Sequence, residues 1–318
     1  MRIAVIGKKN HLFWDTHVKE AFEELGHEVL HFQINVRPLA INLIRNIAKP
    51  FGKKGVSDVM HASILKKELQ RFRPHFTFFT SAFFIPRIYY EVVKELHIPI
   101  FAWDGDGGPC DDSNALYRPF IDILFESELQ YVKKNRLEFK QMEYLPFAVN
   151  PKVFKPLGLR RSSTIFFAGA ATPKRVELLK KIDYPMKIRG WGWQGLAKPG
   201  FDIRNEKLSV EQIIKEYNET LIALNIHQEM NNHIDALNMR TFEVPACGTA
   251  LLCDYRKELE LHFELDEEVI AYDEKNIAEK IEKLEDRAYV EKVAAKGLQR
   301  VLQNHTYARR MQAVLEYL

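Results

Sequence analysis

Short, β-rich apolar runs alternate with longer amphipathic segments along most of this chain of 318 residues. In the first half, the apolar runs predict strands over Ile3–Ile6, Glu28–Ile34, Phe76–Thr80, Ile98–Trp103, Ile121–Glu126 and Tyr144–Ala148. The segments between them predict helices, including Thr16–Leu25, Ser57–Phe72, Arg87–Leu96 and Leu129–Leu137. Nearly continuous apolar strands separated by helices indicate a parallel sheet that is covered on both faces. The first half is therefore predicted to be a doubly wound α/β domain.

The pattern breaks near residue 156 and then starts again. Pro151, Pro156 and the polar stretch Gly158–Ser163 are typical of a linker, so we predict domains over residues 1–156 and 157–318. Strands of the second domain are expected over Thr164–Ala168, Met186–Arg189, Leu221–Ile226, Thr249–Cys253 and Val269–Tyr272. The tail from Asn276 is almost wholly helical by pattern, and its last piece, Tyr307–Leu318, could pack on either domain. The sequence thus predicts two similar α/β domains with a cleft between them.

Composition excludes several classes of protein. The 46 basic and 43 acidic residues leave a net charge of only +3, so bulk charge does not indicate a nucleic-acid partner. The three cysteines show no CxxC spacing and cannot build a disulfide framework. No apolar stretch reaches the ~18 residues of a membrane span, and the first residues fit a strand better than a signal peptide. We therefore expect a soluble, cytoplasmic protein.

The first loop and the absence of compact motifs exclude further classes. A dinucleotide-binding domain would show GxGxxG directly after its first strand, but Gly7 is followed by Lys-Lys-Asn-His with no second glycine. The P-loop, HExxH and GxSxG patterns are also missing from the sequence. The ligand is then expected in the cleft, at the carboxyl ends of the strands.

The most unusual stretch runs from Leu221 to Asp254 and predicts a strand, a polar loop, a short helix and another strand. Because proline is tolerated in the first turn of a helix, Pro245 predicts that this helix begins near Thr241, which would be its N-cap. Gly248 occupies the place where a helix C-terminus favours a left-handed residue.

Three residues of this stretch, Asn238, Arg240 and Thr241, are therefore expected at a helix N-terminus that follows a strand end. Free backbone N–H groups, the helix dipole and a guanidinium together favour a phosphate. Glu243 would bring a carboxylate to the same region, where it could hold ribose hydroxyls. An equally weighted alternative is that Glu243 only complements the helix dipole and pairs with Arg240.

At these residues the sequence resembles a known family, the group 1 glycosyltransferases of the spore-maturation CgeB type. The resemblance is carried by NMRTFEVPACGTALLCD at 238–254, FFAGAATPKR at 166–175, IRGWGW at 188–193, LIALNIH at 221–227 and the closing NHTY block at 304–307 followed by Arg309 and Arg310. In the first half, FAWDGDGGP at 101–109 and YLPFAVNPKVFKP at 144–156 are similar to the partner domain. The likeness covers roughly residues 100 to 318.

The resemblance implies a GT-B fold, in which two Rossmann-like domains face each other and the second binds most of a nucleotide sugar. It implies a glycosyltransferase that moves a sugar from a UDP-sugar or another nucleoside-diphosphate sugar to a glycan, protein or small-molecule acceptor. No metal and no further cofactor are implied. Related enzymes use an E-x7-E pair whose second glutamate serves the ribose. Glu243 matches that position, whereas Asp235 replaces the first glutamate, which leaves its role open.

Further donor-binding residues are expected after the first strands of the second domain. Gly169 and Ala170 would let a donor approach the backbone, and Lys174 and Arg175 would neutralise a diphosphate leaving group. The alternative for both cations is a solvated helix start. Gly190 and Trp191, with Trp193, could form a wall for the base or sugar, although aromatic residues at alternate strand positions are as often core.

Three residues are candidates for a catalytic role. The resemblance favours His227, at a strand end, as a partner of a sugar hydroxyl or phosphate. In the first domain, Asp104 and Asp106 follow a buried strand, and one of them could be the general base for an acceptor hydroxyl. Alternatively, these two residues cap a helix or organise the loop. The parallel pattern argues against reading this D-x-D pair as a metal site.

Two alternatives remain open beside the transferase. The protein could be a two-domain module that binds a nucleotide or a sugar without reacting it. The basic stretch Arg45–Lys54 is expected to be a solvated loop, with an anionic acceptor or peripheral contact with a membrane surface as the alternative.

Overall fold

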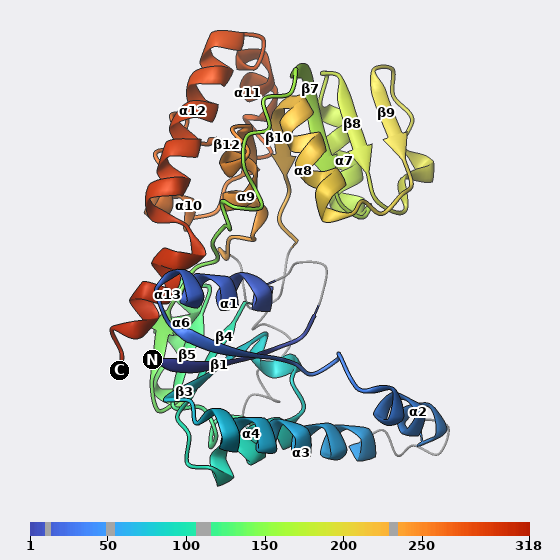
Figure 1. The fold of residues 1–318 in the computed structure, drawn as a ribbon. Helices are drawn as coiled ribbons and strands as arrows, with labels where there is room; N and C mark the ends of the chain where they lie inside the picture. The colour runs from blue at the N-terminus through green and yellow to red at the C-terminus, as the bar shows by residue number, and fades with distance from the viewer. Residues whose placement is uncertain (10–13, 49–54, 106–115, 229–234) are drawn as a thin grey trace. The chain divides into compact units, whose positions relative to one another are not determined.

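A computed structural model describes residues 1–9, 14–48, 55–105, 116–228 and 235–318 (Figure 1). The described chain divides into two compact units. Unit 1 contains Met1–Pro146 and the last nine residues, Arg310–Leu318. Unit 2 contains residues 147–228 and 235–309. The division therefore falls ten residues before the boundary at 156, and the end of the helical tail packs with unit 1.

Unit 1 is built on a parallel sheet of six strands in the order β2-β1-β3-β4-β5-β6. The strands are β1 (Arg2–Gly7), β2 (Glu28–Gln33), β3 (Phe76–Thr80), β4 (Ile100–Asp104), β5 (Ile123–Glu126) and β6 (Met142–Tyr144). The helices that accompany them are α1 (Trp14–Glu24), α2 (Leu39–Ala48), α3 (Gly55–Phe72), α4 (Arg87–Glu95) and α6 (Leu129–Asn135), with short 3-10 turns η2 (Ala82–Phe84) and η4 (Arg136–Glu138). Strands β3, β4 and β5 are buried along their whole length, as expected for the middle of a covered parallel sheet.

The sixth strand and the C-terminus complete this unit. The predicted strand over Tyr144–Ala148 is wrong, because the strand is Met142–Tyr144 and pairing ends soon after it. Leu145 still donates its N–H to the Glu126 carbonyl at 2.8 Å, but Pro146 has no N–H to continue the ladder. The Pro146 carbonyl instead accepts a bond from Arg310 Nε at 2.8 Å. This contact fixes the end of helix α13 (Tyr307–Leu315) on unit 1.

Unit 2 repeats the plan with a six-stranded parallel sheet in the order β12-β11-β10-β7-β8-β9. Its strands are β7 (Ser162–Ala168), β8 (Met186–Arg189), β9 (Phe201–Arg204), β10 (Thr220–Asn225), β11 (Ala250–Asp254) and β12 (Ile270–Tyr272). Its helices are α7 (Pro173–Lys181), α8 (Val210–Glu219), α9 (Arg240–Ala246), α10 (Leu259–His262), α11 (Ile277–Lys283) and α12 (Arg287–Asn304), with the 3-10 turn η5 (Trp193–Gly195). The expected architecture of two doubly wound, Rossmann-like units with a helical tail is confirmed.

The strand order of unit 2 places one point of the sheet in a special position. The chain moves outward from β7 to β8 and β9 and then returns to β10 on the other side of β7. Ligands of open α/β sheets bind at the carboxyl ends of the strands where the order reverses in this way. In unit 2 that place lies beyond Ala168 and Asn225, the last residues of β7 and β10.

Candidate functional site

A hydrogen-bonded network joins the carboxyl ends of β10 and β11, which are neighbours in the sheet of unit 2. Asp254, the last residue of β11, accepts two bonds at its Oδ1 atom from His227, which follows β10. One comes from the backbone N–H at 2.9 Å and one from the ring Nδ1 at 2.7 Å. Its second oxygen, Oδ2, accepts a bond from Arg256 Nη2 at 3.1 Å. Burial alone raises the pKa of Asp254, but these hydrogen bonds and charges lower it below its ordinary value, so Asp254 is a carboxylate.

The bonds to the two ring nitrogens define the protonation of His227. The backbone N–H of Asn238 donates to Nε2 at 3.2 Å, so Nε2 carries a lone pair and Nδ1 carries the proton given to Asp254. The side chain is 5% exposed. Because both nitrogens are engaged inside the protein, His227 holds the loop before α9 against the end of β11. Its contacts are those of a positioning residue.

The entry into α9 differs from the prediction that Thr241 is the N-cap. The helix begins at Arg240, and Thr241 lies inside its first turn, fully buried. The capping acceptor is Asn238, whose side-chain Oδ1 and backbone carbonyl lie 3.3 and 3.1 Å from the Thr241 nitrogen. Asn238 is held in turn by a reciprocal amide pair with Asn225, at 3.0 and 3.1 Å. Asn238, which Asn225 holds at the end of β10, therefore takes the capping role predicted for Thr241. The predicted glycine stop is confirmed, since Gly248 has a φ of +68°.

Arg240 and Glu243 lie in the first turn of α9 and interact through their charges. Burial raises the pKa of Glu243 to about 7, although the Arg240 charge acts in the opposite direction. The Arg240 side chain also hydrogen-bonds to buried Tyr217 of α8, whose pKa is raised by burial. Arg240 thus acts on Glu243 through its charge, whereas the hydrogen bond of its side chain goes to Tyr217. At neutral pH the carboxyl group of Glu243 is therefore close to the midpoint of its titration.

The turns after β7 and β8 are locked together by backbone contacts. Gly169 N–H donates to the Arg189 carbonyl at 2.9 Å, and the Gly169 carbonyl accepts a bond from Trp193 Nε1 at 2.9 Å. Gly190 has a φ of +140°, and a Cβ atom at this position would lie 2.0 Å from the Gly169 oxygen. Gly190 is therefore required by the approach of one turn to the other, whereas a Cβ atom at Gly169 would lie 3.0 Å from the Phe167 ring. Trp191 is 58% exposed, whereas Trp193 belongs to the core.

Lys174 and Arg175, the two cations at the start of α7, occupy different environments. Arg175 is buried and donates to the carbonyls of Ala170 at 3.0 Å and Ile226 at 2.8 Å, so it ties the β7–α7 turn to the end of β10. Burial is the larger cause that lowers the pKa of Arg175, and the nearby positive charge of Arg240 is the second. Lys174 is exposed and lines a cavity.

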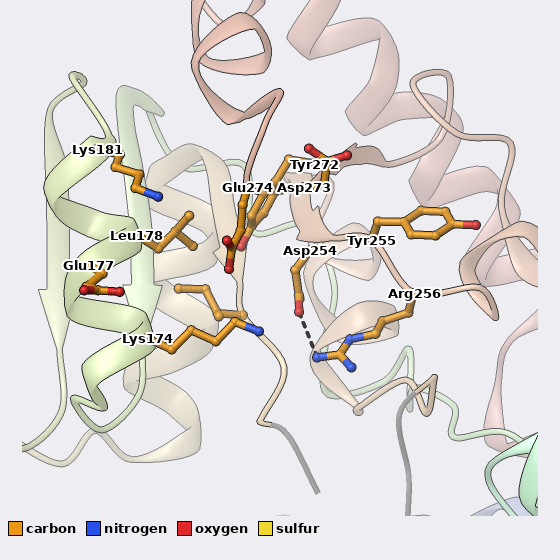
Figure 2. A pocket seen from close by; sticks show the side chains of 11 residues that line it. Lys174, Glu177, Leu178, Lys181, Asp254, Tyr255, Arg256, Tyr272, Asp273 and Glu274 are labelled. Carbon is orange, nitrogen blue, oxygen red and sulfur yellow. Dashed lines mark hydrogen bonds and ion pairs between the residues drawn. The ribbon is translucent and has the colours of Figure 1, made fainter. Parts of the chain in front are cut away.

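This cavity has a volume of about 250 Å³ and lies between α7 and the carboxyl ends of β11 and β12 (Figure 2). Its charged lining consists of three basic residues, Lys174, Lys181 and Arg256, and four acidic residues, Glu177, Asp254, Asp273 and Glu274. In Figure 2 the amino groups of Lys174 and Lys181 extend from α7 into the cavity. Ligand pockets are usually about 300–1,000 Å³, so this cavity could hold only part of a nucleotide sugar.

The donor atoms of His227, Cys253 and Asp254 lie within 4.8 Å of one another, as a metal site would require. The chemistry of the three groups does not fit a bound cation, however. His227 Nδ1 is protonated, and burial followed by the charge of Asp254 holds the pKa of Cys253 well above its ordinary value. A metal ligand must be deprotonated. The three groups therefore form part of the hydrogen-bonded network.

The remaining predicted residues lie apart from this network. Asp235 Oδ1 accepts a bond from the Lys257 backbone at 3.1 Å. In unit 1, Asp104 ends β4, is buried and pairs in register with Glu126 of β5. Burial, followed by the charge of Asp104, raises the pKa of Glu126 well above its ordinary value. Asp106 lies outside the described residues.

Sequence reasoning missed three members of the site: Asn225, Asp254 and Arg256. Asp254 carried a signal, because it ends a buried strand and the resemblance includes a strand ending in Asp. Asn225 is a polar residue at the end of an apolar strand, which is a weaker signal of the same kind. Arg256 follows Asp254 by two residues and shows no pattern of its own.

Comparison with known proteins gave a family match and structural neighbours. Residues 173–316 match a family of proteins described as glycosyl transferase-like. This range contains Lys174, Arg175 and every residue of the network from Asn225 to Arg256. A search of curated proteins gave no significant match. Within the described residues, no helix combines the length and apolar character that a membrane crossing requires.

Solved structures identify the fold as GT-B. A sucrose-phosphate synthase from Thermosynechococcus elongatus superposes with a TM-score of 0.68 at 12% identity, covering 100% of this chain and 98% of that one. HepE from Anabaena, in complex with UDP and glucose, gives a TM-score of 0.67 at 10% identity, with 100% and 99% covered. A putative UDP-N-acetylglucosamine 2-epimerase from Listeria monocytogenes gives 0.59 at 9% identity, with 99% and 95% covered.

We predict that Gly190→Ala destabilises unit 2, because the added Cβ would meet the Gly169 carbonyl and the φ of +140° is strained for alanine. The free energy of unfolding, measured with denaturant, should fall by about 2 kcal/mol or more. Gly195→Ala is the matched control, since a Cβ there meets nothing within 4 Å. Equal stability of the two variants would contradict this account of the turn.

We also predict that Glu243 makes stability depend on pH. Its pKa is about 7 in the folded protein against 4.5 as the ordinary value, so the folded state retains a proton that the unfolded state has released between these pH values. Stability must therefore fall as pH rises through this window, by up to about 3 kcal/mol. Glu243→Gln should lack this component and be the more stable protein above pH 7. Parallel pH profiles for wild type and Glu243→Gln, with the exposed Glu282→Gln as control, would refute the assignment.

Proposed function

We propose that the protein is a glycosyltransferase, of the CgeB type suggested by its motifs, that moves a sugar from a nucleoside-diphosphate sugar to an acceptor hydroxyl. The observation that carries this proposal is the glycosyl transferase-like match over residues 173–316, which contains the whole network of unit 2. The fold alone would not select this reaction, because the GT-B neighbours include both a sucrose-phosphate synthase and a putative epimerase.

The donor is proposed to bind at the carboxyl ends of β7 and β10. HepE, a protein of the same fold, was solved with UDP and glucose, which makes a UDP-sugar the first donor to test. Lys174, exposed at the start of α7, and Arg240, at the start of α9, would supply positive charge to the diphosphate. Glu243 would accept hydrogen bonds from the ribose hydroxyls. The exposed ring of Trp191 would pack against the base or the sugar.

Neutralisation of the leaving group by these cations is proposed to make the transfer metal-independent. A departing nucleoside diphosphate carries negative charge that must be stabilised in the transition state. Arg175 would contribute through its fixed charge and by holding the Ala170 carbonyl in place, since its guanidinium is bonded to two carbonyls. His227 and Asp254 would keep the loop before α9 in the binding position.

On the acceptor side, unit 1 would supply the general base. Asp104 and Asp106 remain the proposed residues, and Asp104 stands beside Glu126 at the ends of β4 and β5. Burial, followed by the Asp104 charge, raises the pKa of Glu126 well above its ordinary value. A raised pKa at Glu126 would favour a proton on that residue and leave Asp104 as the base of the pair. Glycans, proteins and small molecules with a free hydroxyl are the acceptor classes to screen.

Arg240→Ala should raise the KM for the donor by at least about tenfold or abolish transfer, because one charge-assisted contact to phosphate is worth about 1.5–3 kcal/mol. The measurement is release of nucleoside diphosphate from a panel of nucleotide sugars, with and without EDTA. Far-UV circular dichroism should show an intact fold. Arg287→Ala is the matched control, because that arginine is exposed and, within the described part of the chain, forms an ion pair with Glu291 alone.

Unchanged donor kinetics in Arg240→Ala would refute the role given to this arginine. Saturable nucleotide-sugar binding with no release of diphosphate, for any acceptor, would refute the transferase and favour the binding module. Activity lost in EDTA and restored by a divalent cation would refute metal independence alone.

A further inference from the structure

Helix α2 of unit 1 presents an apolar face to solvent. Its exposed residues include Leu39, Leu43 and Ile47, whose exposed fractions are 89%, 61% and 61%. They are spaced by four residues and therefore lie along one stripe of the helix. Among residues 39–47 of this helix, Ile41 alone is buried. Single exposed leucines are ordinary on protein surfaces, but an aligned stripe of three marks an interaction site.

The start of α3 continues the exposed apolar surface. Val56, Val59 and Met60 are 44%, 52% and 39% exposed, and their spacing again places them on one side of a helix. We call the exposed side chains of Leu39, Leu43, Ile47, Val56, Val59 and Met60 the α2–α3 apolar surface. Figure 1 shows α2 beside the end of α3 that is remote from the strands of unit 1. The surface therefore lies away from the core that the sheet and its helices bury.

Specific contacts hold the two helices in this arrangement. Arg37, just before α2, forms an ion pair with Asp58 in the first turn of α3 and donates to Ser57 Oγ at 3.2 Å. Its Nε atom donates to the Ile34 carbonyl at 3.0 Å, and its own carbonyl accepts a bond from the Asn42 side chain at 3.0 Å. The apolar surface is thus presented by anchored helices.

Apart from Asp58, which pairs with Arg37, the charged residues from position 29 to Met60 of the sequence are all basic. Residues 29–57 contain five arginines and lysines and not a single aspartate or glutamate. Arg37 is neutralised by Asp58, but Arg45 is exposed on α2, and the remaining three lysines follow in the sequence. An amphipathic helix that combines an apolar face with cations binds the interface of an anionic bilayer, where both kinds of side chain find partners.

We propose that the α2–α3 apolar surface docks the protein on an anionic lipid bilayer. The leucine and isoleucine side chains enter the boundary between headgroups and acyl chains, while Arg45 meets lipid phosphates. The same surface of a second copy would not provide the opposite charge that Arg45 requires, since its one acidic residue, Asp58, already pairs with Arg37. The proposal is independent of the proposed function, because docking requires neither donor nor acceptor.

The test is co-sedimentation of the full chain with vesicles of phosphatidylcholine and phosphatidylglycerol in equal parts, against vesicles of phosphatidylcholine alone. Wild type should sediment with the anionic vesicles, and binding should weaken as salt is added, because surface charges are screened. The double substitution Leu39→Gln with Leu43→Gln should lower the partition coefficient of the protein into the vesicles by at least about tenfold, since two aliphatic side chains would no longer insert into the lipid. Arg45→Gln should reduce binding to anionic vesicles only.

Leu137→Gln is the matched control, because Leu137 is 99% exposed in the same unit but stands outside this surface. It should bind vesicles as wild type does. The substituted positions on α2 are exposed, so circular dichroism should show unchanged helix content. Absence of wild-type binding, or equal binding by the α2 double variant, would overturn the proposal. Concentration-dependent self-association that the double variant abolishes, without vesicle binding, would assign the surface to a second copy.

Discussion

The carboxylate of Asp254 is the group on which the site in unit 2 depends. It receives the backbone N–H and the ring Nδ1 of His227 and one bond from Arg256, all inside a largely buried region. Hydrogen bonds to a charged group are worth about 1.5–3 kcal/mol each, and an unpartnered buried charge is costly. The position of His227 is therefore tied to the end of β11. Through its other nitrogen, His227 fixes Asn238, and Asn238 fixes the first turn of α9.

Two arginines of unit 2, Arg161 and Arg175, have a structural role, because their guanidinium groups donate to backbone carbonyls. Arg161 donates to the carbonyls of Thr220 and Cys247 at 3.0 and 2.6 Å, and burial lowers its pKa. Arg175 similarly bonds to carbonyls of two separate strand ends. A guanidinium has five N–H donors and accepts no bond, so it can satisfy several carbonyls that no strand or helix reaches. Both arginines therefore cross-link separate backbone segments of unit 2.

The sequence predicts the sheets of this fold better than it predicts the loops between them. Phe76–Thr80 was predicted with its observed bounds, because it is a short apolar run in a covered sheet. Met186–Arg189 was also predicted with its observed bounds, although two of its four residues are charged. Strand β9 (Phe201–Arg204) was missed; it is an edge strand, and none of its four residues is buried. Helix α8 was expected only from the alternation of strands and helices and was given no bounds, although its capping box, Ser209 with Gln212, is visible in the sequence. Helix α2 was read in part as a basic loop, because its apolar stripe does not face the core.

The candidate site was predictable where side chains follow strand ends and unpredictable where partners are distant in the chain. Asn238, Arg240, Thr241 and Glu243 do gather around the start of α9. The pairing of His227 with Asp254 spans 27 residues, and nothing in the spacing reveals it. The N-cap was assigned to Thr241 because local preference was considered alone. The amide pair between Asn225 and Asn238 is a tertiary contact that overrides that preference.

The most direct test of a nucleotide-sugar site in unit 2 is a thermal-shift screen of the full chain against UDP, GDP, dTDP, ADP, CMP and their common sugars, in EDTA. A ligand that binds only the folded state raises its stability by RT ln(1 + [L]/Kd), about 2.7 kcal/mol at 100 times Kd. The account predicts a selective shift with one nucleotide class that EDTA does not remove. No shift with any of these ligands would contradict it.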